Sequence, residues 1–211
     1  MFKAIFFDMD GTLVDTEPIF LRVTQEIFES VGVELSREYY IQHSLTYNKS
    51  TFDILRDKGF SEEECTKIRN ERDIIYTKRL REEAEIFPMV HEVLEYLHKK
   101  YTLAVVTSSY QENFDIIVDK TDIKKYFDFW VVAEDVDPRH KPHPDCYKLA
   151  LSRANKTPPD CLVVEDTERG VQAAKEAGMT CYVIPNTLSR YNNFARADKV
   201  LQSIGTLSSL L

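Results

Sequence analysis

Hydrophobic positions along the chain follow two periods. From residue 87 onward, apolar runs of about four residues alternate with segments in which apolar residues recur every three or four positions. The runs are typical of strands buried on both faces, and the segments of amphipathic helices. This alternation predicts an α/β fold with a doubly wound, Rossmann-like parallel sheet. We expect strands at 103–106, 129–132, 161–164 and 181–184, then an edge strand and a terminal helical turn within 198–211.

The first expected strand, at residues 2–7, stands apart from this alternation. Residues 17–83 follow it and carry only helix signals. Apolar spacing predicts a helix over 19–31 that Gly32 ends, a second helix over 50–58, and a third that opens with a capping box at Ser61–Glu64. We therefore expect an all-helical domain, residues 17–83, inserted into an α/β core formed by residues 1–16 and 84–211.

Polar residues follow three of the expected strands at the point where each one ends. They are Asp8 and Asp10 after the first strand, Thr107 and Ser108 after the second, and Glu165 and Asp166 after the strand at 161–164. Each pair alone could serve as turn formers or helix caps. Because the carboxyl ends of parallel strands meet at one edge of a sheet, we expect the three pairs to converge there. Paired carboxylates at such an edge favour a divalent cation.

Composition narrows the class of protein. The 211 residues have a net charge of −8, which argues against a nucleic-acid partner. No apolar stretch approaches the ~20 residues of a membrane span, and two aspartates interrupt the first apolar run too early for a signal peptide. The four cysteines are far apart in the sequence, as is typical of reduced thiols. We expect a cytoplasmic protein without a membrane partner, either a monomer or a small homo-oligomer.

Four motifs resemble those of the haloacid dehalogenase-like (HAD) superfamily. Asp8–Pro18 resembles its first motif, and the ending Asp-Thr-Glu-Pro is similar to the branch of sugar-phosphate phosphatases and β-phosphoglucomutases. Thr107-Ser108 resembles the second motif. Lys141 stands in a Lys-Pro-x-Pro-Asp sequence similar to the third, and Glu165–Gly170 resembles the fourth. The resemblance covers nearly all of the chain outside residues 17–83.

The resemblance implies a role for each of these residues. Asp8 is expected to be a nucleophile that forms an aspartyl-phosphate, and Asp10 a general acid and base. Thr107 and Lys141 are expected to stabilise the phosphoryl group. The expected magnesium ligands are Asp8, Asp10 through its backbone carbonyl, Asp166, and Glu165 as a ligand or a neighbour of one. The expected substrate-binding residues are Thr16, Ser108 and Gln111. Dehalogenases of the superfamily lack the second aspartate, so Asp10 argues against dehalogenation.

The resemblance favours a Mg²⁺-dependent phosphatase for a small phosphorylated metabolite such as a sugar or polyol phosphate. Residues 17–83 resemble the cap that selects the substrate. Mutases of this branch carry a histidine where this chain has Phe20. They also carry an arginine in the cap that grips a second phosphate, and the corresponding segment Ser44–Lys49 has no arginine, although Lys49 could replace it. A β-phosphoglucomutase-type mutase is the alternative. A second alternative is a non-catalytic binding protein. The complete set of charged motif residues argues against it, because a binding protein has no need of Asp8, Asp10, Lys141 and Asp166 together. Tyr39, Tyr40 and Tyr47 either line a substrate pocket or pack in the interior.

Overall fold

The computed structural model describes residues 1–47 and 49–211. Its sheet has six parallel strands in the order β3-β2-β1-β4-β5-β6. These strands are β1 (Ala4–Phe7), β2 (Thr102–Val106), β3 (Phe129–Val131), β4 (Cys161–Glu165), β5 (Thr180–Val183) and the short edge strand β6 (Lys199–Val200). The prediction of a doubly wound parallel sheet is confirmed.

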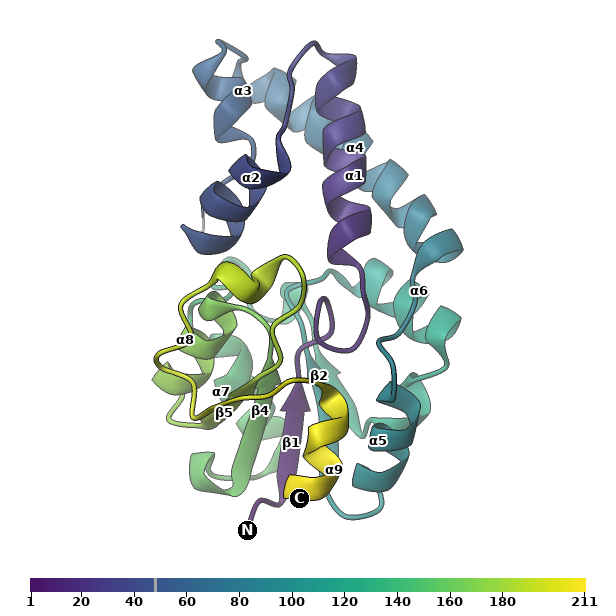
Figure 1. Cartoon of the computed structure of the whole chain (residues 1–211), viewed down its shortest axis with the longest axis vertical. Helices are drawn as coiled ribbons and strands as arrows, with labels where there is room; N and C mark the ends of the chain where they lie inside the picture. Colours follow the sequence, from purple (N-terminus) through teal and green to yellow (C-terminus); the bar gives the residue numbers. More distant parts are fainter. Residues whose placement is uncertain (48) are drawn as a thin grey trace.

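Helices cover both faces of the sheet (Figure 1). One face packs against α5 (Val90–Leu97), α6 (Gln111–Thr121) and α9 (Leu207–Leu210), and the other against α7 (Asp145–Ala154) and α8 (Glu168–Glu176). Side chains of β1 alternate between the two apolar layers, and all of them are fully buried. Burial on both faces explains why the strands are continuous apolar runs.

The described residues of the segment 17–83 form four α-helices above the carboxyl edge of the sheet (Figure 1). They are α1 (Glu17–Ser30), α2 (Arg37–Tyr39), which continues as a π-helix over Tyr40–Thr46, α3 (Asp53–Asp57) and α4 (Glu62–Glu83). This segment, which we call the helical cap, has an apolar cluster of its own that includes Phe28 and Leu55. Leu188 is the contribution of the sheet region to that cluster. That the cap is an independent domain stays a prediction.

Local sequence signals account for the ends of the cap helices. Pro18 lies in the first turn of α1, and Gly32 ends that segment in the left-handed conformation with φ of 74°. The Ser61–Glu64 capping box opens α4, and both of its hydrogen bonds are present. The helix expected over 50–58 covers only Asp53–Asp57. Neither α2 nor its π-helical continuation was predicted, because their few buried positions lack a sustained helical period.

The strand order reverses beside β1, which lies between β2 and β4. Open α/β sheets bind ligands at this point, outside the carboxyl ends of the strands. A cavity of about 600 Å³ lies here, between the sheet edge and the helical cap. Cys65, Cys146, Cys161 and Cys181 are buried free thiols. In the described part of the chain, no helix is long and apolar enough to cross a membrane.

Candidate active site

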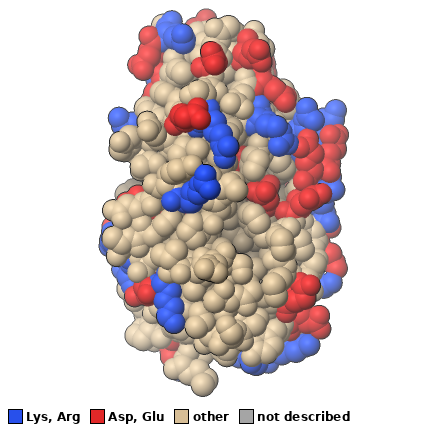
Figure 2. All heavy atoms as spheres, viewed as in Figure 1, with Lys and Arg blue, Asp and Glu red and all other residues tan. Residues whose placement is uncertain are grey.

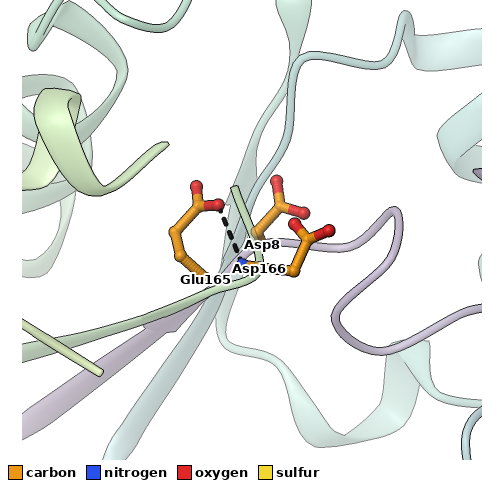
Figure 3. A group of neighbouring side chains, drawn as sticks. All are labelled: Asp8, Glu165 and Asp166. Atoms are coloured by element: carbon orange, nitrogen blue, oxygen red, sulfur yellow. Dashed lines mark hydrogen bonds between the residues drawn. The ribbon is translucent and has the colours of Figure 1, made fainter. Parts of the chain in front are cut away.

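Three carboxylates meet where β1 and β4 end. Asp8, Glu165 and Asp166 are buried, and each offers an oxygen within 4.8 Å of the oxygens of the other two. Figure 3 shows these carboxylates side by side beyond the strand ends. Strand register brings them together: Phe7 pairs with Val164, and the Asp8 N–H donates to the Val164 carbonyl at 2.9 Å. The expected convergence of the first and last motifs is therefore present.

Lys141 reaches this group from the loop before α7. Its Nζ donates to Asp8 Oδ1 at 2.6 Å, to Glu165 Oε1 at 2.6 Å and to the Val106 carbonyl at 2.8 Å. Burial acts to lower the pKa of Lys141, but the charges of the two carboxylates outweigh it, so the pKa is raised. The lysine is therefore a permanently charged partner that fixes the orientation of Asp8.

Glu165 is held by four side-chain or backbone donors. Besides Lys141, it accepts hydrogen bonds from the Tyr147 hydroxyl at 2.7 Å, the Asp166 N–H at 3.2 Å and the Thr167 hydroxyl at 3.2 Å. Its carboxyl group also packs on Gly170, where an added Cβ would lie 2.0 Å from Glu165 Cδ. The carboxylate thus has one orientation, and only glycine fits behind it.

Asp166 has a partner that the sequence did not reveal. Asn186 donates from Nδ2 to Asp166 Oδ2 at 2.7 Å and to the Gly11 carbonyl at 3.2 Å. A Cβ at Gly11, whose φ is +81°, would lie 2.5 Å from Asp166 Oδ2. Asn186 follows β5 at the same edge of the sheet, and that position was the available signal. The loop after β1 and the loop after β5 therefore hold Asp166 from two sides.

Three hydroxyl groups hold the side chain of Asp10. Thr16 donates to Oδ1 at 2.6 Å, and Thr107 and Ser109 donate to Oδ2 at 3.1 Å and 2.8 Å. Thr107 was expected to donate its proton to a phosphoryl oxygen, but here it donates that proton to Asp10. Thr16, an expected substrate-binding residue, orients Asp10 here, and Ser109 was not among the predicted site residues. Asp10 therefore lies beside Asp8 with its carboxylate restrained.

The charge at the strand ends fits a divalent cation. Burial raises the pKa of Asp8 to about 7 although Lys141 opposes the rise, and burial together with Asp8 and Glu165 raises the pKa of Asp166 well above its usual range. Three carboxylates thus face one lysine. Asp8 Oδ2 and the Asp10 carbonyl accept no hydrogen bond from the described residues. Free anionic and carbonyl oxygens around an excess of negative charge are the donor set that Mg²⁺ prefers.

The expected substrate-binding residues separate into two groups. Thr16 and Ser108 line the cavity. Gln111 is not among the described lining residues, because its side-chain amide donates to Asp115 at 3.0 Å along α6. Of the three tyrosines considered, Tyr40 lines the cavity, whereas Tyr47 is 67% exposed and Tyr39 stacks on His43.

The wall of the cavity carries arginines that sequence reasoning missed. Arg69 and Arg72 of α4 line it together with Lys49, and Arg169 lines it from α8. On the outer face of the molecule drawn in Figure 2, basic side chains lie near the level where the cap meets the sheet region. Arg72 lies over the ring of Phe20, 4.6 Å from its centroid. Charged residues on helices ordinarily face water, so the sequence offers no signal for these positions. Asn48, part of the loop compared with the mutase motif, lies outside the described residues.

This fold and site define a class of protein with a doubly wound α/β core, a lysine-paired carboxylate group at the switch point and a helical cap above it. A family model described as "Haloacid dehalogenase-like hydrolase" matches residues 5–184. The chain belongs to the haloacid dehalogenase-like hydrolase family, and the resemblance stated above is confirmed.

Named relatives and solved structures extend this comparison. A "Phosphorylated carbohydrates phosphatase" of Thermotoga maritima is 32% identical over 84% of this chain and 82% of its own. The "Fructose-1-phosphate phosphatase YqaB" of Escherichia coli is 31% identical over 84% of this chain and 94% of its own. The crystal structure of CbbY from Rhodobacter sphaeroides in complex with phosphate superposes with a TM-score of 0.85 at 28% identity, covering 98% of this chain and 96% of the other.

Proposed function

We propose that this protein is a Mg²⁺-dependent phosphatase that hydrolyses a phosphorylated sugar or polyol through an aspartyl-phosphate on Asp8. The observation that carries the proposal is the state of that side chain. Asp8 Oδ1 is held by Lys141 at 2.6 Å, while Oδ2 accepts no hydrogen bond from the described residues and Asp8 lines the cavity. An oriented carboxylate with one free oxygen is a suitable nucleophile. The names of both curated relatives support the substrate class.

The cation would be held by Asp8, Asp166 and the backbone carbonyl of Asp10, with Glu165 as a ligand or as a neighbour of one, since both Glu165 oxygens already accept hydrogen bonds. When bound, Mg²⁺ supplies positive charge that offsets the repulsion between an anionic nucleophile and an anionic phosphate. Lys141 contributes a second fixed positive charge from the protein side. We expect the backbone N–H of Ser108 and the hydroxyl of Thr107 to donate to phosphoryl oxygens. For Thr107 this requires its hydroxyl to rotate away from Asp10.

The reaction then proceeds in two steps. Asp8 Oδ2 attacks phosphorus, the bond from phosphorus to the ester oxygen breaks, and Asp10 gives a proton to the departing alkoxide. Asp10 next removes a proton from water, which attacks the phosphorus of the aspartyl-phosphate. The bond to Asp8 breaks, and inorganic phosphate leaves while the Asp8 carboxylate is restored. Asp10 therefore serves first as acid and then as base.

The decisive test is Asp8→Asn with p-nitrophenyl phosphate and Mg²⁺. Removing the nucleophile is expected to reduce turnover by at least ~10³-fold, because no covalent path remains. The amide has the size of the carboxyl group, and Lys141 keeps Glu165 as its counter-ion, so the melting temperature should stay close to that of the wild type. A retained melting temperature separates loss of chemistry from loss of fold. Full activity in a folded Asp8→Asn protein would overturn the proposal.

A mutase remains a second candidate because of the cap arginines. Arg69 and Arg72 line the cavity opposite the strand ends and could hold a second phosphate group. Against it, Phe20 packs edge-on against Tyr76 at a ring-centroid distance of 5.2 Å and brings no titratable group to the site. Conversion of β-glucose 1-phosphate to glucose 6-phosphate, stimulated by the glucose bisphosphate, would favour the mutase. Release of inorganic phosphate without isomerisation would favour the phosphatase.

A further inference from the structure

We infer that Glu17 and Arg169 form a hydroxyl-binding pair that selects substrates with a polyol chain. The inference deepens the proposed function and rests on it. Glu17 is the first residue of α1, where the chain enters the helical cap, and Arg169 lies in the first turn of α8 beside the sheet. Both side chains line the cavity that contains Asp8. They approach that cavity from opposite sides of the junction between cap and sheet region.

Glu17 presents an oriented carboxylate with spare capacity. The Tyr40 hydroxyl donates to Glu17 Oε2 at 2.9 Å, and among the described residues no donor occupies Oε1. Burial raises the pKa of Glu17, while Arg169 and the Tyr40 hydrogen bond oppose the rise. Tyr40 is itself buried, at 3% exposure, so it fixes the direction in which Glu17 points. The carboxylate can therefore accept a hydrogen bond from a molecule in the cavity.

Arg169 presents a guanidinium group with unused donors. It is partly buried, and it forms neither a hydrogen bond nor an ion pair with any residue the structure describes. Its strongest charge interaction is with Glu17, followed by Tyr40, Asp166 and Asp8. A guanidinium carries five N–H donors in a planar fork, and at the cavity wall these donors are available to a molecule in the cavity. The group is thus near Glu17 but too far away to bond to it directly.

An acceptor and a donor group on either side of a gap match the chemistry of a hydroxyl. A hydroxyl donates one hydrogen bond, here to Glu17, and accepts another, here from Arg169. A second phosphate group at this position would be repelled by the Glu17 carboxylate, and an alkyl chain would leave both groups desolvated and unpaired. A chain of vicinal hydroxyls extending from the phosphate satisfies both groups, so the pair would favour sugar and polyol phosphates.

The test compares sorbitol 6-phosphate with n-hexyl phosphate, whose chains have equal length but differ in their hydroxyl groups. The wild type is expected to favour sorbitol 6-phosphate in kcat/KM by at least tenfold. Glu17→Gln and Arg169→Met should each reduce that preference by about tenfold to a hundredfold, chiefly through KM, as expected for loss of a hydrogen bond to a charged group. Glu29→Gln, at the exposed end of α1, should keep the wild-type preference.

Four other outcomes would contradict the inference or the proposed function. A ratio of the two kcat/KM values that does not change in Glu17→Gln and Arg169→Met would overturn the inference. An equal fall for both substrates would also overturn it, since the pair would then join cap and sheet region rather than bind hydroxyls. A wild-type enzyme that hydrolyses both compounds without preference would refute the pair but leave the phosphatase intact. A wild type that hydrolyses neither compound, nor p-nitrophenyl phosphate, would refute the proposed function itself.

Discussion

Lys141→Met tests the charge balance at the strand ends. Methionine keeps most of the length of the lysine side chain and removes its charge. The lysine side chain is 3% exposed and contacts Asp8 and Glu165 at 2.6 Å each, with a third bond to the Val106 carbonyl. The substitution therefore leaves two buried carboxylates without their cation.

The size of the effect follows from these contacts. Removing one partner of a buried ion pair costs about 3–5 kcal/mol, because the remaining charge stays buried. For a chain of this length, 1 kcal/mol shifts the melting temperature by about 2–4 °C. We expect a fall of roughly 10 °C at pH 8 without Mg²⁺. At pH 5 the fall should be smaller, because Asp8, whose pKa is about 7, is then mostly protonated and needs no cationic partner.

Thermal unfolding in EDTA at both pH values measures this difference. Lys148→Met, at an exposed position on the neighbouring helix α7, is the matched control and should change the melting temperature little. Phosphatase activity of Lys141→Met should fall by at least ~10²-fold, since the group that orients Asp8 is lost. An unchanged melting temperature at pH 8 would refute the reasoning. An equal fall at both pH values would assign the loss to packing rather than to charge.

Three further predictions concern the same edge of the sheet. Asp10→Asn should release a burst of p-nitrophenolate and then turn over at least ~10²-fold more slowly than the wild type, because p-nitrophenolate leaves without an acid whereas hydrolysis of the aspartyl-phosphate needs a base. A linear time course at the wild-type rate would contradict this prediction. In EDTA the wild type should melt at lower temperature at pH 8 than at pH 5, because the pKa values of Asp8 and Asp166 are both raised. The contribution of Asp8 to stability is present below pH ~4 and is lost as the pH rises through its pKa of about 7, and the raised pKa of Asp166 acts in the same direction. Saturating Mg²⁺ should reverse that loss at pH 8, and a pH-independent melting temperature in EDTA would refute it. Gly170→Ala should lower the free energy of unfolding, measured by chemical denaturation, by about 1–3 kcal/mol, because the new Cβ would lie 2.0 Å from Glu165 Cδ. A variant as stable as the wild type would contradict the prediction and show that Glu165 can move.

Much of the fold was predictable because its elements carry strong local signals. The strand at β4 is a run of apolar residues buried on both faces, and α4 opens with a capping box, so neither depends on knowing what packs against it. The π-helical continuation of α2 carries no such signal. Its buried residues, Tyr40 among them, take their positions from contacts with the other cap helices.

The half of the candidate site that lies at the strand ends was predictable for a related reason. Asp8, Thr107 and Asp166 come directly after strands, and a parallel sheet necessarily brings such residues to one edge. Their partners were less visible. Tyr147 reaches Glu165 from the interior side of α7, a position that looks like ordinary core packing. Asn186 follows β5, and only the structure shows that it donates to Asp166 rather than to its own loop alone.

Local sequence patterns predict the strands, most of the cap helices and the residues at the floor of the site, since these depend on local period and on chain direction. Tertiary structure alone decided what faces them. Arg69, Arg72 and Arg169 occupy helix positions that ordinarily point to water, and Glu17 begins a helix as many acidic residues do. They line one cavity because the cap lies over the carboxyl edge of the sheet. Packing between distant segments sets that placement, and no local pattern encodes it.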